Sequence, residues 1–155
     1  MQNTQAEARI LPLAEEHLSD VAELERLCFS EPWSEQSLRM LTEVGALGIV
    51  AVVGDRAVAY GGMTTVLDEG AVTNIATHPE FRRRGLGRRV TEALLRSAAD
   101  VGVSTVFLEV RQSNGAAIAL YEALGFRACG IRKNFYRHPT ESAIQMVWTA
   151  EETKR

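Results

Sequence analysis

The sequence predicts an α/β fold of about seven strands and about four helices. Three kinds of pattern lead to this prediction: apolar and β-branched runs, segments with apolar residues every three or four positions, and turn residues between them. A chain of 155 residues is long enough to bury an adequate core, so we expect one domain over residues 1–155. With 46% hydrophobic and 24% charged residues, the composition is ordinary for a globular protein.

The first part of the chain predicts one strand and two helices. Arg9–Leu13 is β-like, and apolar residues recur at helical spacing through His17–Phe29. The Ser30–Trp33 segment contains proline and interrupts this helix. Ser34 is a favourable N-cap, and we expect it to begin a second helix that runs through Glu43.

Three β-like runs follow these helices. Gly48–Val53 and Ala57–Leu67 are separated by Gly54-Asp55, which is typical of a tight hairpin turn. The third run is Ala71–Thr77. These segments therefore predict consecutive strands, the first two paired as a hairpin.

The second half predicts helices and strands in alternation. Leu86–Val101 carries an apolar stripe at helical spacing, and Val103–Val110 is almost continuously apolar, as in a strand covered on both faces. Asn114–Leu124 is expected to form a short helix that Gly125 ends. Two further strands complete the prediction: Phe126–Lys133 and Ser142–Trp148.

The most distinctive segment lies at residues 81–89, which read Phe-Arg-Arg-Arg-Gly-Leu-Gly-Arg-Arg. Five arginines and two glycines stand where a strand gives way to a helix, in a chain whose net charge is −3. A helix start presents unpaired N–H groups and the positive end of the helix dipole, and glycine lets a ligand approach the backbone closely. The segment therefore predicts a binding site for a phosphate-bearing small molecule.

Other interpretations of this segment are weaker. A Rossmann fingerprint would need glycine where Val90 stands, and the Gly-Lys-Ser/Thr ending of a Walker A loop is missing. Contact with nucleic acid is disfavoured by the negative net charge and by the lack of aromatic residues among the arginines. A merely solvated helix start is disfavoured because arginines oppose the helix dipole unless an anion compensates them.

Two residues are candidates for acid–base chemistry. Glu109 lies in an apolar strand, where loss of hydration suits a carboxylate to act as a general base, although pairing with a neighbouring arginine is an equal alternative. Tyr121 lies seven residues after Asn114 on the same helix face, and its phenol is able to protonate a leaving thiolate. A core tyrosine with a satisfied hydroxyl is the structural alternative.

The pattern Arg82-x-x-Gly85-x-Gly87 between a strand and a helix resembles the acetyl-CoA loop of the GNAT acetyltransferase superfamily. Residues 108–126, Leu-Glu-Val-Arg-Gln-Ser-Asn-Gly-Ala-Ala-Ile-Ala-Leu-Tyr-Glu-Ala-Leu-Gly-Phe, closely resemble its RimI-type branch, the N-terminal alanine acetyltransferases of ribosomal proteins. Three further segments agree with that branch: Pro32–Glu35, Asn74–Ala76 and Arg132–Tyr136. The resemblance covers nearly the whole chain, and the order of the predicted elements is that of the superfamily.

The resemblance implies a mixed, mostly antiparallel sheet and an acetyl-CoA-dependent enzyme that acetylates the N-terminal alanine of a small-subunit ribosomal protein. It implies that Glu109 is the general base and Tyr121 the general acid. Trp33 and Tyr136 would flank the acceptor peptide, although each is also a plausible packing residue. The residues expected to line acetyl-CoA are Ile75, Ala76, Thr77, Arg83, Arg84, Gly85, Leu86, Gly87, Arg88 and Asn114.

Other functions remain open at this stage. A member of the superfamily that acetylates lysine or a small amine, or a non-catalytic acetyl-CoA sensor, would share most of these residues. We expect a cytoplasmic monomer or weak dimer without metal, membrane segment or direct contact with nucleic acid, since no apolar run approaches about 20 residues and no secretory signal is visible. Cys28 and Cys129 lack metal-type spacing and are expected to be reduced and buried, although the sequence leaves a bridge between them open.

Overall fold

A computed structural model describes residues 7–150, and its helices and strands follow the predicted order. Short 3-10 turns at Glu15–His17, Arg39–Thr42 and Pro79–Phe81 accompany them. The main elements are β1 (Arg9–Pro12), α1 (Leu18–Cys28), α2 (Glu35–Leu38), β2 (Ala46–Val53), β3 (Arg56–Val66), β4 (Glu69–Thr77), α3 (Leu86–Asp100), β5 (Thr105–Arg111), α4 (Gly115–Ala123), β6 (Arg127–Tyr136) and β7 (Glu141–Thr149).

The strands form one sheet of seven in the order β1-β2-β3-β4-β5-β7-β6. Five of the six neighbouring pairs are antiparallel and β4–β5 is parallel, which confirms the mixed, mostly antiparallel sheet. The parallel pairing joins only Glu69–Ala71 to Thr105–Phe107. In the described chain the two strands do not pair beyond this point, so a gap opens in the middle of the sheet.

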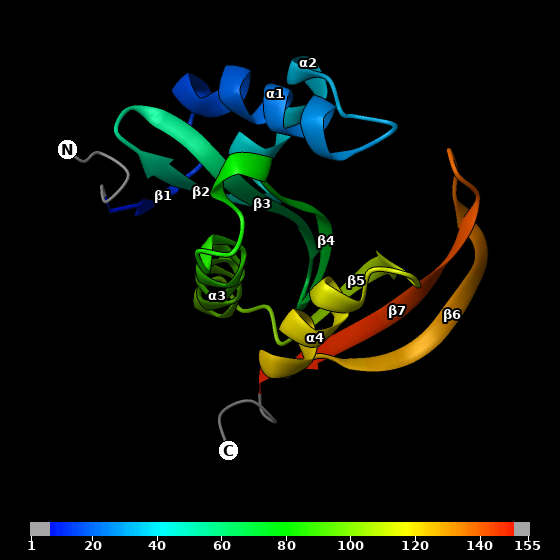
Figure 1. The fold of residues 1–155 in the computed structure, drawn as a ribbon. Coiled ribbons are helices and arrows are strands. Elements are labelled where there is room, and N and C mark those ends of the chain that lie inside the picture. Colours follow the sequence, from blue (N-terminus) through cyan, green and yellow to red (C-terminus); the bar gives the residue numbers. More distant parts are fainter. Residues whose placement is uncertain (1–6, 151–155) are drawn as a thin grey trace.

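The helices lie on both faces of the sheet. α1 and α2 cover one face of β2–β4 and α3 covers the other (Figure 1). Leu18, Leu24 and Tyr60 belong to the core on the first side, and Val90 and Leu94 to the core on the second. Each of these aliphatic side chains is almost wholly buried and stabilises the fold by about 1.5–3 kcal/mol.

α3 shows how the sequence determines a local element. Leu86, Val90, Leu94 and Ala98 recur every four residues, and all four are buried against the sheet. The helix begins after Gly85, whose φ of +76° lies in the left-handed region that favours glycine. The prediction of this helix is confirmed to within one residue at its C-terminal end.

Three predictions of local structure are wrong. The β5 strand is buried on one face only, because Val106, Leu108 and Val110 pack into the core while Phe107 and Glu109 stay partly exposed on the other face. Cys129 is exposed rather than buried, since it lies on the edge strand β6, although both cysteines are free as expected.

The third error concerns the second helix, which was expected to run through Glu43. Ser34 caps it as predicted, because its Oγ accepts a hydrogen bond of 3.1 Å from the Ser37 amide. The helix then tightens after Leu38 into a 3-10 turn. There Thr42 Oγ1 donates to the Arg39 carbonyl at 2.7 Å, a side-chain bond that competes with regular helix.

Candidate active site

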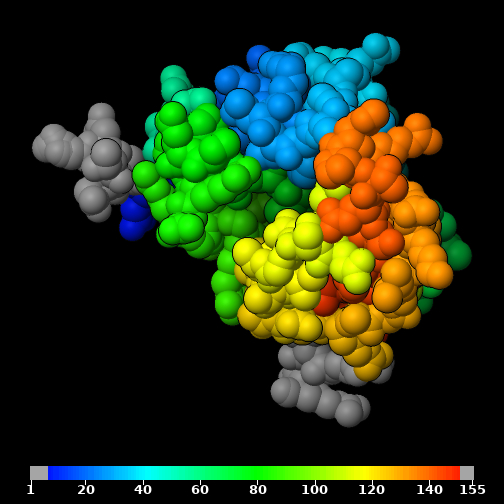
Figure 2. All heavy atoms as spheres, turned by 45° about the vertical axis from the view of Figure 1, so that its right-hand side comes forward, coloured from blue at the N-terminus to red at the C-terminus, as the bar shows by residue number. Residues whose placement is uncertain are grey.

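A cavity of about 690 Å³ occupies the gap between β4 and β5. Its walls are the segment after α1, the middle of β4, the end of β5 with the start of α4, and the tip between β6 and β7. Figure 2 shows the hollow where these blue, green, yellow and orange segments meet. Segments far apart in the sequence therefore converge on one site.

The loop before α3 has the geometry of an anion site. Arg83 and Gly85 both have positive φ, and no atom stands within 4 Å of the position that a Cβ at Gly85 would occupy. The first hydrogen bond within the helix runs from the Arg89 amide to the Gly85 carbonyl at 3.1 Å. The amides of Leu86, Gly87 and Arg88 therefore have no carbonyl partner in the preceding turn. The first turn of α3 contains no acidic residue.

The arginines of this loop are exposed, and several are held by neighbours. Arg82 Nε donates to the Thr77 carbonyl at 3.2 Å, and the guanidinium of Arg84 lies 4.9 Å from the centre of the Phe81 ring. Arg88 pairs with Glu92 at 3.3 Å. A solvated helix surface is the alternative to an anion site, and this ion pair shows that Arg88 fits the alternative. The backbone amides rather than Arg88 are thus the better candidates for the anion site.

The end of β4 directs backbone groups into the gap. The His78 amide donates to the Val58 carbonyl of β3 at 2.8 Å. Because backbone groups alternate along a strand, those of Ala76 also face β3, whereas those of Ile75 and Thr77 face away from it. The Thr77 carbonyl accordingly accepts from Arg82 and from the Cys28 thiol.

Glu109 enters the cavity from β5. Its side chain is 23% exposed, and its Oε2 lies 3.4 Å from Arg132 Nε. The same oxygen accepts a hydrogen bond from Gln145 Nε2 at 3.4 Å. The arginine partner that the sequence left as an alternative is therefore present. The other carboxylate oxygen, Oε1, takes no part in either contact, so the pairing does not occupy the whole group.

Tyr121 faces the same cavity from α4. The residue is 8% exposed, and its ring packs against Phe126 with centres 5.7 Å apart. Burial, with a smaller contribution from Tyr136, raises the pKa of Tyr121 to about 12. Its phenol thus stays protonated at neutral pH. Asn114 also lines the cavity, and its Oδ1 caps α4 by accepting from the Ala117 amide at 3.2 Å.

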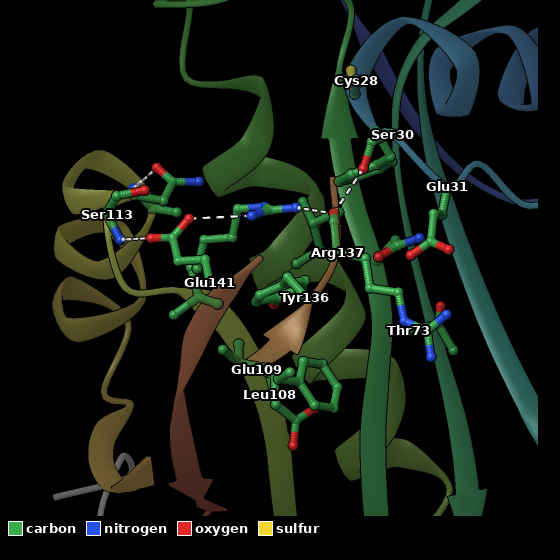
Figure 3. Close-up of a pocket in the computed structure, with 18 of the residues that line it drawn as sticks. Cys28, Ser30, Glu31, Thr73, Leu108, Glu109, Ser113, Tyr136, Arg137 and Glu141 are labelled. Carbon is green, nitrogen blue, oxygen red and sulfur yellow. Dashed lines mark hydrogen bonds and ion pairs between the residues drawn. The ribbon is translucent and has the colours of Figure 1, made fainter. Parts of the chain in front are cut away.

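The tip between β6 and β7 closes one side of the cavity, where Figure 3 labels Tyr136, Arg137 and Glu141. Arg111 on β5 holds this tip in place. Arg111 donates to the carbonyls of Arg137 and Pro139, each at 3.0 Å, and to Glu141 Oε1 at 3.2 Å. Its guanidinium lies 4.6 Å from the centre of the Tyr136 ring. Burial, and then the charge of Glu109, raises the pKa of Tyr136 to about 12.

Glu141 links the same tip to the start of α4. Its Oε2 accepts from the Ser113 amide at 2.6 Å. The pKa of Glu141 is lowered, first by hydrogen bonding from the Ser113 side chain and then by this amide bond and by Arg111. Sequence patterns do not indicate these contacts of Arg111 and Glu141, because the bonded residues are 26–30 positions apart. A second missed residue is Glu25, for which a signal existed: an acidic residue within the apolar stripe of the helix His17–Phe29.

The cavity brings together only part of the predicted site. It is lined by both proposed catalytic residues and by four others: Glu109, Tyr121, Trp33, Ile75, Asn114 and Tyr136. Ala76, Thr77 and the loop residues from Arg83 to Arg88 lie outside the lining. The anion loop and the acid–base residues therefore form two adjoining regions rather than one pocket.

In residues 7–150 no group of three or more His, Cys, Asp or Glu side chains is arranged to hold a metal ion. Over the same residues no helix has the length and apolarity needed to cross a membrane.

A helix start with unpaired amides beside a gap in the sheet, and a carboxylate and a protonated phenol in that gap, fit an enzyme that transfers a group from a phosphate-bearing donor. The chain matches the acetyltransferase (GNAT) family over residues 18–126 and belongs to that family. Members of this family use acetyl-CoA as the acetyl donor.

The similarities extend over most of the chain. It is 43% identical over 129 residues to the [ribosomal protein bS18]-alanine N-acetyltransferase of Salmonella typhimurium, covering 81% of this chain and 86% of that protein. The crystal structure of the ribosomal-protein-S18-alanine N-acetyltransferase from Escherichia coli superposes with a TM-score of 0.85 at 36% identity, covering 92% of this chain and 93% of that one. An aminoglycoside 6'-N-acetyltransferase from Enterococcus faecium has a TM-score of 0.75 at 18% identity, over 91% of this chain and 96% of that one, which shows the fold alone.

Proposed function

We propose that this chain transfers the acetyl group of acetyl-CoA to the N-terminal α-amine of a protein, with the N-terminal alanine of a small-subunit ribosomal protein as its acceptor. The observation that carries the proposal is the shared cavity of Glu109, Tyr121, Trp33 and Tyr136 between β4 and β5. The substrate class is supported by the relative from Salmonella typhimurium, which carries that activity in its name.

The residues before and within the start of α3 fit the diphosphate of the donor. The N–H groups of Leu86, Gly87 and Arg88 supply hydrogen bonds and the helix start supplies partial positive charge. A Cβ at Gly87 would make only an ordinary contact, 3.6 Å from Thr77 Oγ1, so packing does not require glycine there. The close approach of a ligand to the backbone would require it. Ile75, Ala76, Thr77, Arg83, Arg84, Gly85 and Asn114 complete the proposed binding region.

The proposed chemistry is a direct transfer. The neutral amine attacks the thioester carbonyl, an N–C bond forms, and the C–S bond breaks. Glu109 removes the amine proton, either directly or through a water molecule, and Tyr121 gives a proton to the thiolate that leaves. The amides of Ile75 and Thr77, which face away from β3, polarise the carbonyl.

The α-amine is the easier acceptor for this machinery. With a pKa near 7.8, roughly 10% of an α-amine is neutral at pH 7, against less than about 0.1% of a lysine with a pKa near 10.4. The fold alone does not decide the acceptor, since an aminoglycoside-modifying enzyme shares it at 18% identity. The acceptor class therefore needs a direct test.

The test uses an alanine-starting peptide that contains one internal lysine, and a matched peptide whose N-terminus is blocked. Each is incubated with the protein and acetyl-CoA, and mass spectrometry maps the acetylated position. We expect acetylation of the α-amine only, with no product from the blocked peptide and almost none from Glu109→Gln. Acetylation of lysine in both peptides would contradict the proposal and favour a lysine acetyltransferase. Tight binding of coenzyme A with no transfer to either peptide would favour a sensor.

A further inference from the structure

Glu25 is a fully buried carboxylate that the proposed chemistry does not use. It lies on α1 with 0% of its surface exposed, directly behind the wall of the cavity that it does not itself line. Burying a carboxylate costs free energy unless hydrogen bonds replace its hydration. The hydrogen-bond donors around Glu25 therefore need to be identified.

Three donors from three different segments converge on this carboxylate. Its Oε1 accepts from the backbone amide of Trp33 at 2.9 Å. Its Oε2 accepts from Asn74 Nδ2 at 2.9 Å and from the hydroxyl of Tyr60. The carboxylate thus joins α1 to the loop after it, to β3 and to β4.

Two of these partners line the cavity. Trp33 lies in the loop that the sequence assigns to the acceptor, and Asn74 immediately precedes Ile75 on β4. The same loop is attached at its other end, where Ser30 Oγ donates to the Arg137 carbonyl at 3.2 Å. One end of the loop is therefore fixed through Glu25 to β4, and the other end is fixed to the tip between β6 and β7.

We propose that Glu25 is a positioning residue. It attaches the loop between α1 and α2 (residues 29–34, the acceptor loop) to β4 through Trp33, so that the bound amine is held in line with the donor carbonyl. This inference rests on the proposed function of the site. Glu25 touches neither substrate, and its effect passes through Trp33 and Asn74. The positioning depends on the length of the Glu25 side chain, because its Oε1 must reach the Trp33 amide to accept their single hydrogen bond.

Two conservative variants separate reach from charge. Glu25→Asp keeps the charge but withdraws the oxygens by one methylene, so the Trp33 amide loses its acceptor. Glu25→Gln keeps the reach, because its amide oxygen still faces Trp33 while its NH₂ group donates to the Tyr60 hydroxyl and, once the Asn74 amide has turned over, to Asn74 Oδ1. Tyr60→Phe removes one bond to the same carboxylate and leaves the Trp33 bond intact.

A matched control lies on the same helix. Asp20 Oδ2 accepts from the Ala57 amide at 2.9 Å and so joins α1 to the beginning of β3, away from the cavity lining. Asp20→Ala removes that bond. It therefore reports the effect of weakening the attachment of α1 without changing the acceptor loop.

The experiment measures the KM for the alanine-starting peptide, the KM for acetyl-CoA, kcat and the melting temperature of each variant. We expect Glu25→Asp to raise the peptide KM about tenfold, as for the loss of one hydrogen bond to a charged acceptor, with the acetyl-CoA KM within about twofold of wild type. For Glu25→Gln, the peptide KM and the acetyl-CoA KM should each stay within about threefold of wild type. Tyr60→Phe and Asp20→Ala should lower the melting temperature and leave the peptide KM within about twofold.

Two results would overturn the inference while the proposed function stands: a wild-type peptide KM in Glu25→Asp, or an equal rise in Asp20→Ala. A wild-type chain that transfers nothing to the peptide would overturn the proposed function, and the inference with it.

Discussion

Replacing Arg111 by methionine tests how strongly one side chain holds the tip between β6 and β7. The guanidinium makes three hydrogen bonds to that tip and stacks on Tyr136. The side chain is 27% exposed and that of Glu141 is 19% exposed, so solvent partly screens their ion pair. Methionine retains most of the apolar stem but none of the donors, so the polar contacts account for nearly all of the change.

The magnitude follows from these contacts. A hydrogen bond from a charged donor contributes about 1.5–3 kcal/mol when buried, and we take about 1 kcal/mol for each of the two carbonyl bonds at this partly exposed tip. Stacking on the ring adds about 0.5–1 kcal/mol. The screened ion pair with Glu141 adds about 0.5 kcal/mol. The sum is about 3 kcal/mol, which for a chain of this size corresponds to a fall in melting temperature of roughly 6–12 °C.

Calorimetry at pH 7 measures the melting temperature, and the peptide assay measures KM in the same preparation. We expect the lower melting temperature together with a raised peptide KM, because Tyr136 and Arg137 line the cavity. Arg9→Met is the control, since the Arg9 side chain donates to the Gly54 carbonyl at 3.0 Å on an exposed turn far from the site. A melting temperature of Arg111→Met within about 2 °C of wild type, or an unchanged peptide KM, would refute the reasoning.

Three further predictions concern pH and the anion loop. Tyr121→Phe should lower kcat roughly 100-fold, because the leaving thiolate loses its proton donor. Since the pKa of Tyr121 is raised to about 12, the wild-type rate should rise to about pH 8 and stay level to about pH 10. A rate that falls below about pH 9 would contradict this. Since the pKa of Glu141 is lowered, its stabilising effect is present above about pH 4.3 and lost as pH falls through the lowered value. The stability gap between wild type and Glu141→Gln in urea melts should therefore shrink below about pH 4, and a gap that is constant from pH 7 to pH 3 would count against this assignment. Gly85→Ala should cost about 1–2 kcal/mol of stability, because alanine is strained at the φ of +76° found there. The KM for acetyl-CoA should rise, because Gly85 belongs to the proposed binding loop. A wild-type melting temperature for this variant would show that the strain is absent.

The sequence predicted those parts of the fold that depend on local pattern. The four-residue recurrence of Leu86, Val90 and Leu94 specifies α3, and Gly54-Asp55 specifies the turn between β2 and β3. The acid–base residues Glu109 and Tyr121 were found from a motif, and the structure brings both to one cavity, although their roles remain a prediction. Their convergence follows from the parting of β4 and β5 beyond Ala71 and Phe107, which sequence patterns do not reveal.

The parts that the sequence missed depend on contacts between distant residues. Val103–Val110 is apolar enough for burial on both faces, but the helices cover only one face of β5, and this depends on where α3 and α4 pack. Arg111 is an ordinary charged residue in the sequence, and only the folded tip between β6 and β7 gives it three acceptors. Glu25 likewise gains its meaning from Trp33, Asn74 and Tyr60, which lie on three other segments.

The most direct test is the N-terminal acetylation of the small-subunit ribosomal proteins, measured by mass spectrometry in cells of the source organism with and without the gene for this chain. The proposed function predicts that one protein with an N-terminal alanine loses its acetyl group on deletion. The wild-type gene should restore the group, and a gene carrying Glu109→Gln should not. An unchanged set of acetylated N-termini after deletion would contradict it.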